Sequence, residues 1–283
     1  MTMQVAEQVI AETEKAQQKP AANERFFFDN NGYLVLENFL SPDHVQQLNA
    51  ALSRVIERRR AQKQQNLPHT GMTQFKGDRS TRIFYILDDD PLFLELLDWP
   101  AMVPYVKGLL NAKPHHHASD AIVEYASDLM SRGMGWHLDG HDNGYRNLGH
   151  PIPLLQLKIG YYLTDMTEPG QGNLTIVPGS HKALFDPAPE DLKKPELFLG
   201  AIQVCAPAGT AILFHNALWH SSGPFTKTDG QRTILYYAYE HPWMIASQEH
   251  WGYTKEFYNQ RLSPEQRKFF HGFVFDPPEQ RWG

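Results

Sequence analysis

The stretch Gly135-Trp136-His137-Leu138-Asp139-Gly140 lies near the middle of the chain, and the predicted fold is organised around it. On an extended backbone, His137 and Asp139 place their side chains on the same face because they are two positions apart. One imidazole and one carboxylate can then bind a metal ion from adjacent corners. The chain contains 14 His and 16 Asp among 283 residues, so such a triplet arises by chance. A metal site therefore requires a third ligand from elsewhere in the chain.

Short strands are predicted on both sides of this stretch, each bounded by Gly, Pro, Asp or Ser. They are expected at residues 81–87, 121–125, 154–164, 173–177, 201–205, 210–215 and 233–241. Many short strands separated by turns are typical of a β-sandwich or barrel. Because the predicted helices come mainly before these strands, we expect an α+β, mainly β, domain whose N-terminal helices cover the outside of a barrel.

The first part of the chain combines a polar segment with helix signals. A strand at residues 32–36 precedes Ser41-Pro42-Asp43, which has a capping side chain, a proline and an acid in the order that begins a helix. Asp90-Pro91 and Trp99-Pro100 begin two shorter helices. We expect residues 1–23 to be a flexible N-terminal segment and residues 24–283 to form a single domain.

Composition excludes several classes of function. The net charge is −6 without a basic patch, so nucleic acid is not an expected partner. Apolar runs are too short to span a membrane. The single cysteine, Cys205, excludes an internal disulfide and indicates a reducing compartment. We expect a cytoplasmic protein, a monomer or homodimer, that binds a small molecule, with Cys205 as a buried structural thiol.

A third metal ligand is available at His220, in Leu218-Trp219-His220-Ser221-Ser222-Gly223. Two histidines and one carboxylate on one face of an ion are typical of non-haem Fe(II) oxygenases. A polar loop follows, and Arg232 begins the next strand. We expect its charge to point into the barrel, where it requires a buried anion. The alternative is an exposed Arg, or one paired with a surface acid.

The order of these segments resembles the phytanoyl-CoA dioxygenase family of Fe(II)/2-oxoglutarate-dependent oxygenases. The resemblance covers most of the chain from about Phe27 onward. Its motifs are Gly32-Tyr33-Leu34-Val35-Leu36 with Ser41-Pro42, Trp136-His137-Leu138-Asp139, Tyr161-Tyr162-Leu163-Thr164-Asp165, Gly172-Asn173-Leu174-Thr175-Ile176-Val177-Pro178-Gly179-Ser180-His181, and Trp219-His220-Ser221-Ser222-Gly223 with Arg232-Thr233. The resemblance implies a double-stranded β-helix, the jelly-roll fold of cupins.

The resemblance also implies a reaction and the residues that support it. His137, Asp139 and His220 would bind Fe(II), while Arg232 and Ser222 would bind the distal carboxylate of 2-oxoglutarate. Arginine suits this role because its planar donors match a carboxylate at two points. Dioxygen would complete the site, and a dioxygenase acting as a hydroxylase of an unactivated C–H bond, releasing succinate and CO2, is implied. Related halogenases carry Ala or Gly at the carboxylate position, so Asp139 favours hydroxylation or a desaturation-like outcome.

Two other functions fit part of the pattern. One is a cupin-like metal enzyme that does not use 2-oxoglutarate, which Arg232 and Ser222 argue against. The other is a non-catalytic binding protein on the same fold, which the complete ligand set argues against.

Several further polar residues allow two interpretations. Gln156 and Lys158 lie on the polar face of the alternating segment 154–163, which faces either solvent or the site; we include Gln156 among the candidate co-substrate contacts. Glu124 raises the same question. We expect His115-His116-His117 to lie in a loop at the surface or at the rim of the site. His181 is expected to be structural, and Asp88-Asp89-Asp90 to be a solvated helix start.

Overall fold

The computed structural model describes residues 19–65, 73–76, 80–126, 135–140, 145–193, 200–226, 230–244 and 253–270. Most of the expected flexible segment, residues 1–18, lies outside these ranges. Helix α2 (Ala22–Asn31) begins inside the remainder of that segment. Among the described residues, no helix is both long and apolar enough to cross a lipid bilayer.

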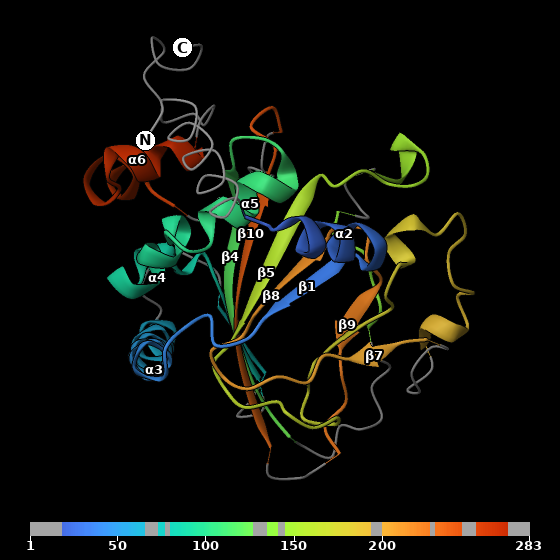
Figure 1. The fold of residues 1–283 in the computed structure, drawn as a ribbon. Coiled ribbons are helices and arrows are strands. Elements are labelled where there is room, and N and C mark those ends of the chain that lie inside the picture. The colour runs from blue at the N-terminus through green and yellow to red at the C-terminus, as the bar shows by residue number, and fades with distance from the viewer. Residues whose placement is uncertain are drawn as a thin grey trace, which may run out of the picture.

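Two antiparallel sheets form the body of the protein (Figure 1). The larger sheet has the order β1-β8-β5-β10-β4-β3-β2, with β1 at Tyr33–Leu36, β8 at Ala211–His215, β5 at Gln156–Tyr162, β10 at Gln231–Glu240, β4 at His115–Tyr125, β3 at Ser80–Phe84 and β2 at Thr73–Lys76. The smaller sheet has the order β7-β6-β9, with β7 at Ile202–Gln203, β6 at Leu174–Ile176 and β9 at His220–Ser222. Apolar side chains of both sheets share one buried cluster, so the sheets face each other as in a jelly roll.

Helices cover the other face of the larger sheet. α3 (Pro42–Gln64) begins as expected at Ser41, whose hydroxyl accepts a hydrogen bond from the His44 amide. α4 (Pro91–Glu95), α5 (Val103–Leu110) and α6 (Pro264–Arg267) are shorter. Figure 1 shows α3, α4 and α6 on the side of the molecule away from β7 and β9. The N-terminal helices therefore flank the sheet on its outer face, as the sequence predicts.

The alternation in β5 follows from this layering. Leu157, Ile159 and Tyr161 are fully buried in the cluster that includes residues of α3 and α5. Side chains on the opposite face of β5 therefore point toward the smaller sheet. Gln156 and Lys158 belong to that inner face, so of the two interpretations open from the sequence, the inward one is correct.

The His115-His116-His117 run is not a surface loop, and that expectation is wrong. All three residues belong to β4, and His115 and His116 are buried. The pairing of β4 with β10 places Glu240 opposite His115. The buried Glu240 carboxylate contacts Nδ1 of His115 at 3.0 Å and Nδ1 of His117 at 2.7 Å. Partners across the sheet thus allow polar side chains in a buried strand.

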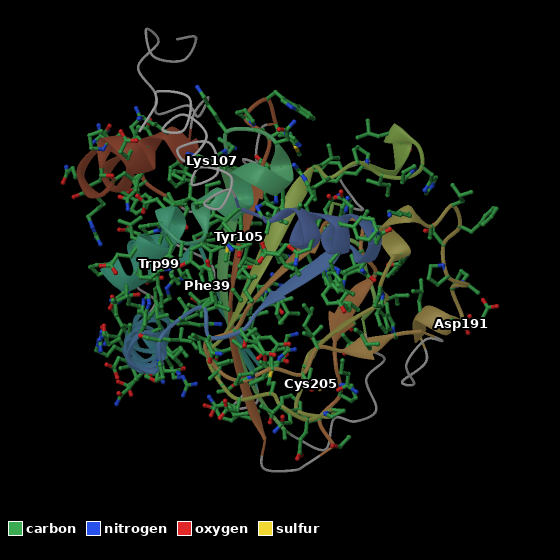
Figure 2. The ribbon with its side chains drawn as sticks, viewed as in Figure 1. Phe39, Trp99, Tyr105, Lys107, Asp191 and Cys205 are labelled. Carbon is green, nitrogen blue, oxygen red and sulfur yellow. The ribbon has the colours of Figure 1, made fainter. Side chains whose placement is uncertain are left out.

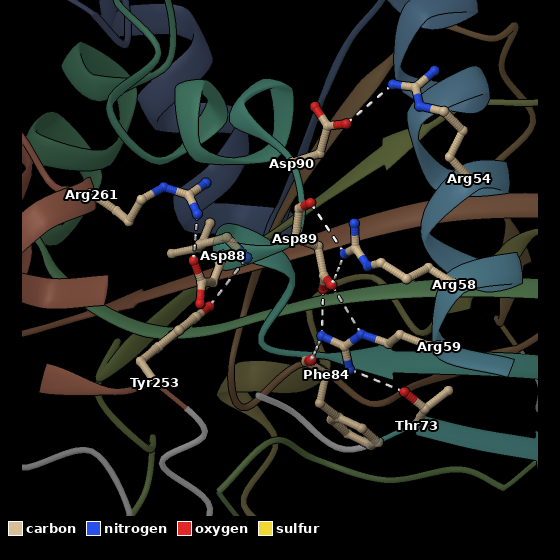
Figure 3. Close-up of polar contacts among 11 residues, drawn as sticks. Arg54, Arg58, Arg59, Thr73, Phe84, Asp88, Asp89, Asp90, Tyr253 and Arg261 are labelled. Carbon is tan, nitrogen blue, oxygen red and sulfur yellow. Dashed lines mark hydrogen bonds and ion pairs between the residues drawn. The ribbon is translucent and has the colours of Figure 1, made fainter. Parts of the chain in front are cut away.

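The expectation of a solvated acidic run at residues 88–90 is also wrong in part. Asp90 does cap α4, since its carboxylate accepts from the Leu92 amide. The side chain of Asp89, however, is only 4% exposed, and Arg58 and Arg59 of α3 both bind its carboxylate (Figure 3). The Arg59 side chain is only 1% exposed. Asp89 and Asp90 therefore attach the start of α4 to α3, whereas Asp88 pairs with Arg261.

Two predictions about single residues have different outcomes. His181 is buried, and its Nε2 lies 3.2 Å from the Asp29 carbonyl oxygen, as expected for a structural histidine. Cys205 follows β7 rather than lying within it, and it is half-buried rather than fully buried (Figure 2). Burial raises the pKa of its thiol, which disfavours the nucleophilic thiolate.

Candidate metal centre

Backbone pairing brings the two histidines of the predicted site together. His137 and His220 form an antiparallel bridge, with amide-to-carbonyl distances of 3.0 and 3.1 Å between them. On its other side, His220 pairs with Ile176 of β6. The four strands β5 to β8 separate the two histidines in sequence, yet the fold places the histidines side by side. The smaller sheet thus positions His220 beside the central stretch.

The three predicted ligands form one cluster. One ligand atom from each of His137, Asp139 and His220 lies within 4.8 Å of the others. The distance from His220 Nε2 to Asp139 Oδ2 is 3.7 Å, and the two imidazole centroids are 4.2 Å apart. His220 is buried, whereas His137 is exposed. A metal ion bound here would have protein on one side and open positions on the other.

Hydrogen bonds orient both imidazoles for metal binding. Nδ1 of His137 lies 2.8 Å from the Gly135 carbonyl oxygen, and Nδ1 of His220 lies 2.8 Å from that of Leu218. A carbonyl only accepts, so Nδ1 carries the proton in each ring. The lone pair of Nε2 is then available in both. This carbonyl support is typical of histidines that bind metals.

Electrostatics keep the ligands in the protonation states that a metal requires. Burial opposes ionisation of Asp139, but the Lys158 ammonium and the two imidazoles outweigh it and hold the pKa of the carboxyl well below its usual range. Burial lowers the pKa of His220 to about 3, so the ring is neutral at neutral pH. An anionic carboxylate and a neutral imidazole are the ligand forms that bind divalent ions. The donor set therefore fits a divalent metal ion.

Lys158 binds one oxygen of the Asp139 carboxylate and leaves the other available to a metal ion. Its Nζ lies 2.8 Å from Oδ1, which leaves Oδ2 on the side of His220. The ammonium also lies over the Tyr236 ring, 5.7 Å from its centroid. In the sequence, the alternation of polar and apolar residues along β5 allows Lys158 to face the site. It does not identify Asp139 as the partner of Lys158.

Asn216 supports the site and was not identified from the sequence. Its buried side-chain oxygen accepts from the amides of Leu155 and Gln156, and its carbonyl accepts from the Asp139 amide at 2.9 Å. It therefore connects the start of β5 to the ligand loop. Its short segment between β8 and β9 carries no motif that marks an asparagine with this role.

Arg232 and Ser222 lie together, as the sequence predicts. Nη2 of Arg232 donates to Ser222 Oγ at 2.7 Å, and Nη1 donates to the Gly172 carbonyl at 2.7 Å. Arg232 is 1% exposed. Gly172 is essential to this arrangement, because a Cβ there would lie 2.9 Å from Arg232 Cδ, and the residue has a φ of +76°.

The anion beside Arg232 is Glu124. Its Oε2 lies 2.6 Å from Nη2, and the two residues are direct partners across β10 and β4. The guanidinium points inward and is neutralised, as expected for a buried charge. The neutralising group is a partly exposed carboxylate of the chain itself, which the sequence offered only as the alternative interpretation.

Gln156 has other partners. Its side-chain amide donates to the Tyr145 hydroxyl at 3.0 Å and lies 3.1 Å from Nε2 of His117. Tyr145 in turn packs on Gly140, where a Cβ would lie 2.1 Å from its ring. Gln156 thus contacts the residues that surround the ligand loop, and a contact with a co-substrate stays a prediction.

Comparison with known proteins identifies the family. The profile of the phytanoyl-CoA dioxygenase (PhyH) family matches residues 28–234. The chain belongs to this family. The family and the oxygenase class expected from the sequence are thereby confirmed. The ectoine dioxygenase of Nocardia farcinica is 23% identical over 227 residues, which cover 71% of this chain and 73% of that protein.

Solved structures of similar fold agree with the two-sheet architecture. The structure of EctD from S. alaskensis with bound Fe superposes with a TM-score of 0.61 at 24% identity, covering 78% of this chain and 77% of EctD. HygX from Streptomyces hygroscopicus, solved with nickel, 2-oxoglutarate and hygromycin B, has a TM-score of 0.60 at 19% identity, covering 79% and 88% of the two chains. The jelly-roll fold is therefore confirmed, although the barrel is not closed.

Proposed function

We propose that this protein is an Fe(II)- and 2-oxoglutarate-dependent oxygenase that hydroxylates a C–H bond of a small molecule. The observation that carries the proposal is the cluster of His137, Asp139 and His220, with both imidazoles oriented by carbonyl groups. These three side chains would hold the iron. When bound, iron and 2-oxoglutarate supply the oxidising power that inserts one atom of dioxygen into a C–H bond, with succinate and CO2 as products.

Arg232 and Ser222 would bind the distal carboxylate of 2-oxoglutarate. Arg232 is rigidly placed because Gly172 and Ser222 hold its guanidinium. Lys158 would keep the Asp139 carboxylate from turning, so that one oxygen faces the metal. The role of the chain in the reaction is thus to position the reactants and to exclude water.

The inner face of the larger sheet favours a polar substrate over a long acyl chain. Between Arg232 and Gln156, this face carries charged and polar side chains that pair across strands. The pairs are Arg232–Glu124, Arg82–Asp120 and His117–Glu240. An acyl chain against this face would remove water from these paired groups without replacing it by any polar contact, which is unfavourable. Nocardia farcinica ectoine dioxygenase and HygX, whose complex contains hygromycin B, support a small polar molecule as the substrate class.

Anaerobic titration tests the proposal. Protein with Fe(II) should develop a weak visible charge-transfer band when 2-oxoglutarate is added, and admitting air should release succinate. Arg232→Ala should weaken 2-oxoglutarate binding by about one hundredfold, because two charge-assisted hydrogen bonds are lost, with iron affinity unchanged. The control His137→Ala should instead lose iron. Absence of both the band and succinate across a broad panel of substrates would favour a cupin-like enzyme or a binding protein.

A further inference from the structure

The Nη2 nitrogen of Arg232 already has two oxygen neighbours, whereas Nε has no hydrogen-bond partner among the described residues. A guanidinium binds a carboxylate at two points along one of two edges, Nη1–Nη2 or Nε–Nη2, and both edges include Nη2. Nη2 carries two hydrogens. One is donated to Ser222 Oγ at 2.7 Å, and the Glu124 Oε2 oxygen lies 2.6 Å from the same nitrogen. Two-point binding of any further carboxylate therefore requires one of these contacts to break.

Of the two contacts, that with Glu124 has to break. Ser222 is neutral, and its hydroxyl can accept from Arg232 while it donates to a carboxylate beside it. Glu124 is an anion, so it repels a second carboxylate at the same nitrogen. Its side chain is 33% exposed, and within the described ranges its carboxylate otherwise contacts Ser80 Oγ, at 3.5 Å. Glu124 can therefore move into solvent, whereas the 1% exposed Arg232 is held in place.

We propose that Glu124 competes with the distal carboxylate of 2-oxoglutarate for Arg232 and thereby sets the affinity of the protein for this co-substrate. The inference rests on the proposed function. In the protein without co-substrate, Glu124 neutralises a buried cation whose other partners, Ser222 and Gly172, are uncharged; a buried charge without a counter-ion is costly. Binding of the dicarboxylate replaces one anion by another at Arg232 and releases Glu124. A keto acid without the distal carboxylate does not displace Glu124.

Anaerobic titrations of the Fe(II) protein test the competition. Glu124→Gln retains the size of the side chain and removes its charge. We expect it to bind 2-oxoglutarate about tenfold more tightly than the wild type, which corresponds to the loss of one competing charge contact. Binding of pyruvate, which lacks the distal carboxylate, should be unchanged. Without co-substrate, Glu124→Gln should also melt at a lower temperature than the wild type. Added 2-oxoglutarate should raise the melting temperature of the variant by more than that of the wild type.

Arg82 provides a matched control, because it forms the neighbouring ion pair with Asp120. Asp120→Asn, which likewise removes a charge without changing the size of the side chain, should leave 2-oxoglutarate affinity unchanged. If Glu124→Gln bound 2-oxoglutarate as weakly as the wild type or more weakly, competition would be excluded, and Glu124 would be a positioning partner of Arg232. An equal increase in the affinity of Glu124→Gln for pyruvate and for 2-oxoglutarate would also contradict the proposed competition. If neither the wild type nor Glu124→Gln bound 2-oxoglutarate, the proposed function would itself fail.

Discussion

At the scale of single residues, Lys158 controls how Asp139 can bind a metal. Its ammonium holds Oδ1 at 2.8 Å, so the carboxylate is restricted to binding through Oδ2. Lys158→Met removes this restraint and a positive charge near the metal. We expect metal affinity to rise by about tenfold while 2-oxoglutarate affinity falls, because a two-oxygen carboxylate occupies a position that the co-substrate requires. Titration of Co(II) and then of 2-oxoglutarate, monitored by visible absorption, measures both.

Lys158→Arg is the matched control, because it keeps a cation beside Oδ1. It should retain most of the affinity for the co-substrate. A parallel fall of metal and 2-oxoglutarate affinity in Lys158→Met would show that Lys158 serves only to pack the inner face.

At the scale of elements, the attachment of α3 to the start of α4 depends on one buried ion pair. Arg59 and Asp89 have side chains 1% and 4% exposed, and Arg59 also donates to Thr73 Oγ1 at 3.0 Å (Figure 3). Arg59→Ala leaves Asp89 with the partly exposed Arg58 as its remaining charged partner. We expect the free energy of unfolding to fall by about 3–5 kcal/mol, as for other buried pairs that lose one partner. Urea unfolding of Arg59→Ala and of the wild type provides the measurement.

Arg54 on the same helix provides the control. Its side chain is 63% exposed and pairs with Asp90 at 3.1 Å. Arg54→Ala should lower stability by less than about 1 kcal/mol. Similar losses in the two variants would contradict a special role for the buried pair.

At the scale of the whole molecule, buried histidines determine the response to acid. Burial lowers the pKa of His116 and His215 to about 3 each. In the unfolded chain both titrate near 6.5. The unfolded state therefore takes up protons first, so their contribution is complete above pH 6.5 and is lost as the pH falls toward 3. Outside the metal centre, these two histidines should together lower the free energy of unfolding by about 2.7 kcal/mol per pH unit between these limits.

His116→Phe removes one of the two side chains that take up a proton on unfolding and so measures its separate contribution. His116 lies among Tyr239, Tyr253 and Phe270, and neither ring nitrogen has a hydrogen-bond partner in the described part of the chain. The variant should be at least as stable as the wild type at pH 7, and its stability should fall by about 1.4 kcal/mol less per pH unit. His150→Gln, at an exposed position, should leave the slope unchanged. An unchanged slope in His116→Phe would place the proton uptake elsewhere.

The predictions that succeeded depend on local signals. The start of α3 at Ser41-Pro42 and the alternation in β5 follow from capping and from the two-residue period of a strand, which act within a few residues. The predictions that failed involve partners distant in sequence. His115 is buried because β10 brings Glu240 to it, and the side chain of Asp89 is buried because α3 brings Arg59 to it. Neither partner can be identified from the neighbouring residues alone.

The sequence by itself determined the α+β class, the family and the three side chains of the candidate metal centre, because ligand type, strand period and motif order are written along the chain. Only the tertiary structure decided that Lys158 restrains Asp139, that Asn216 supports the ligand loop and that Glu124 occupies Arg232. These contacts depend on which strands pair and in which register. A shift of one residue would turn each of these strand side chains to the other face of the sheet.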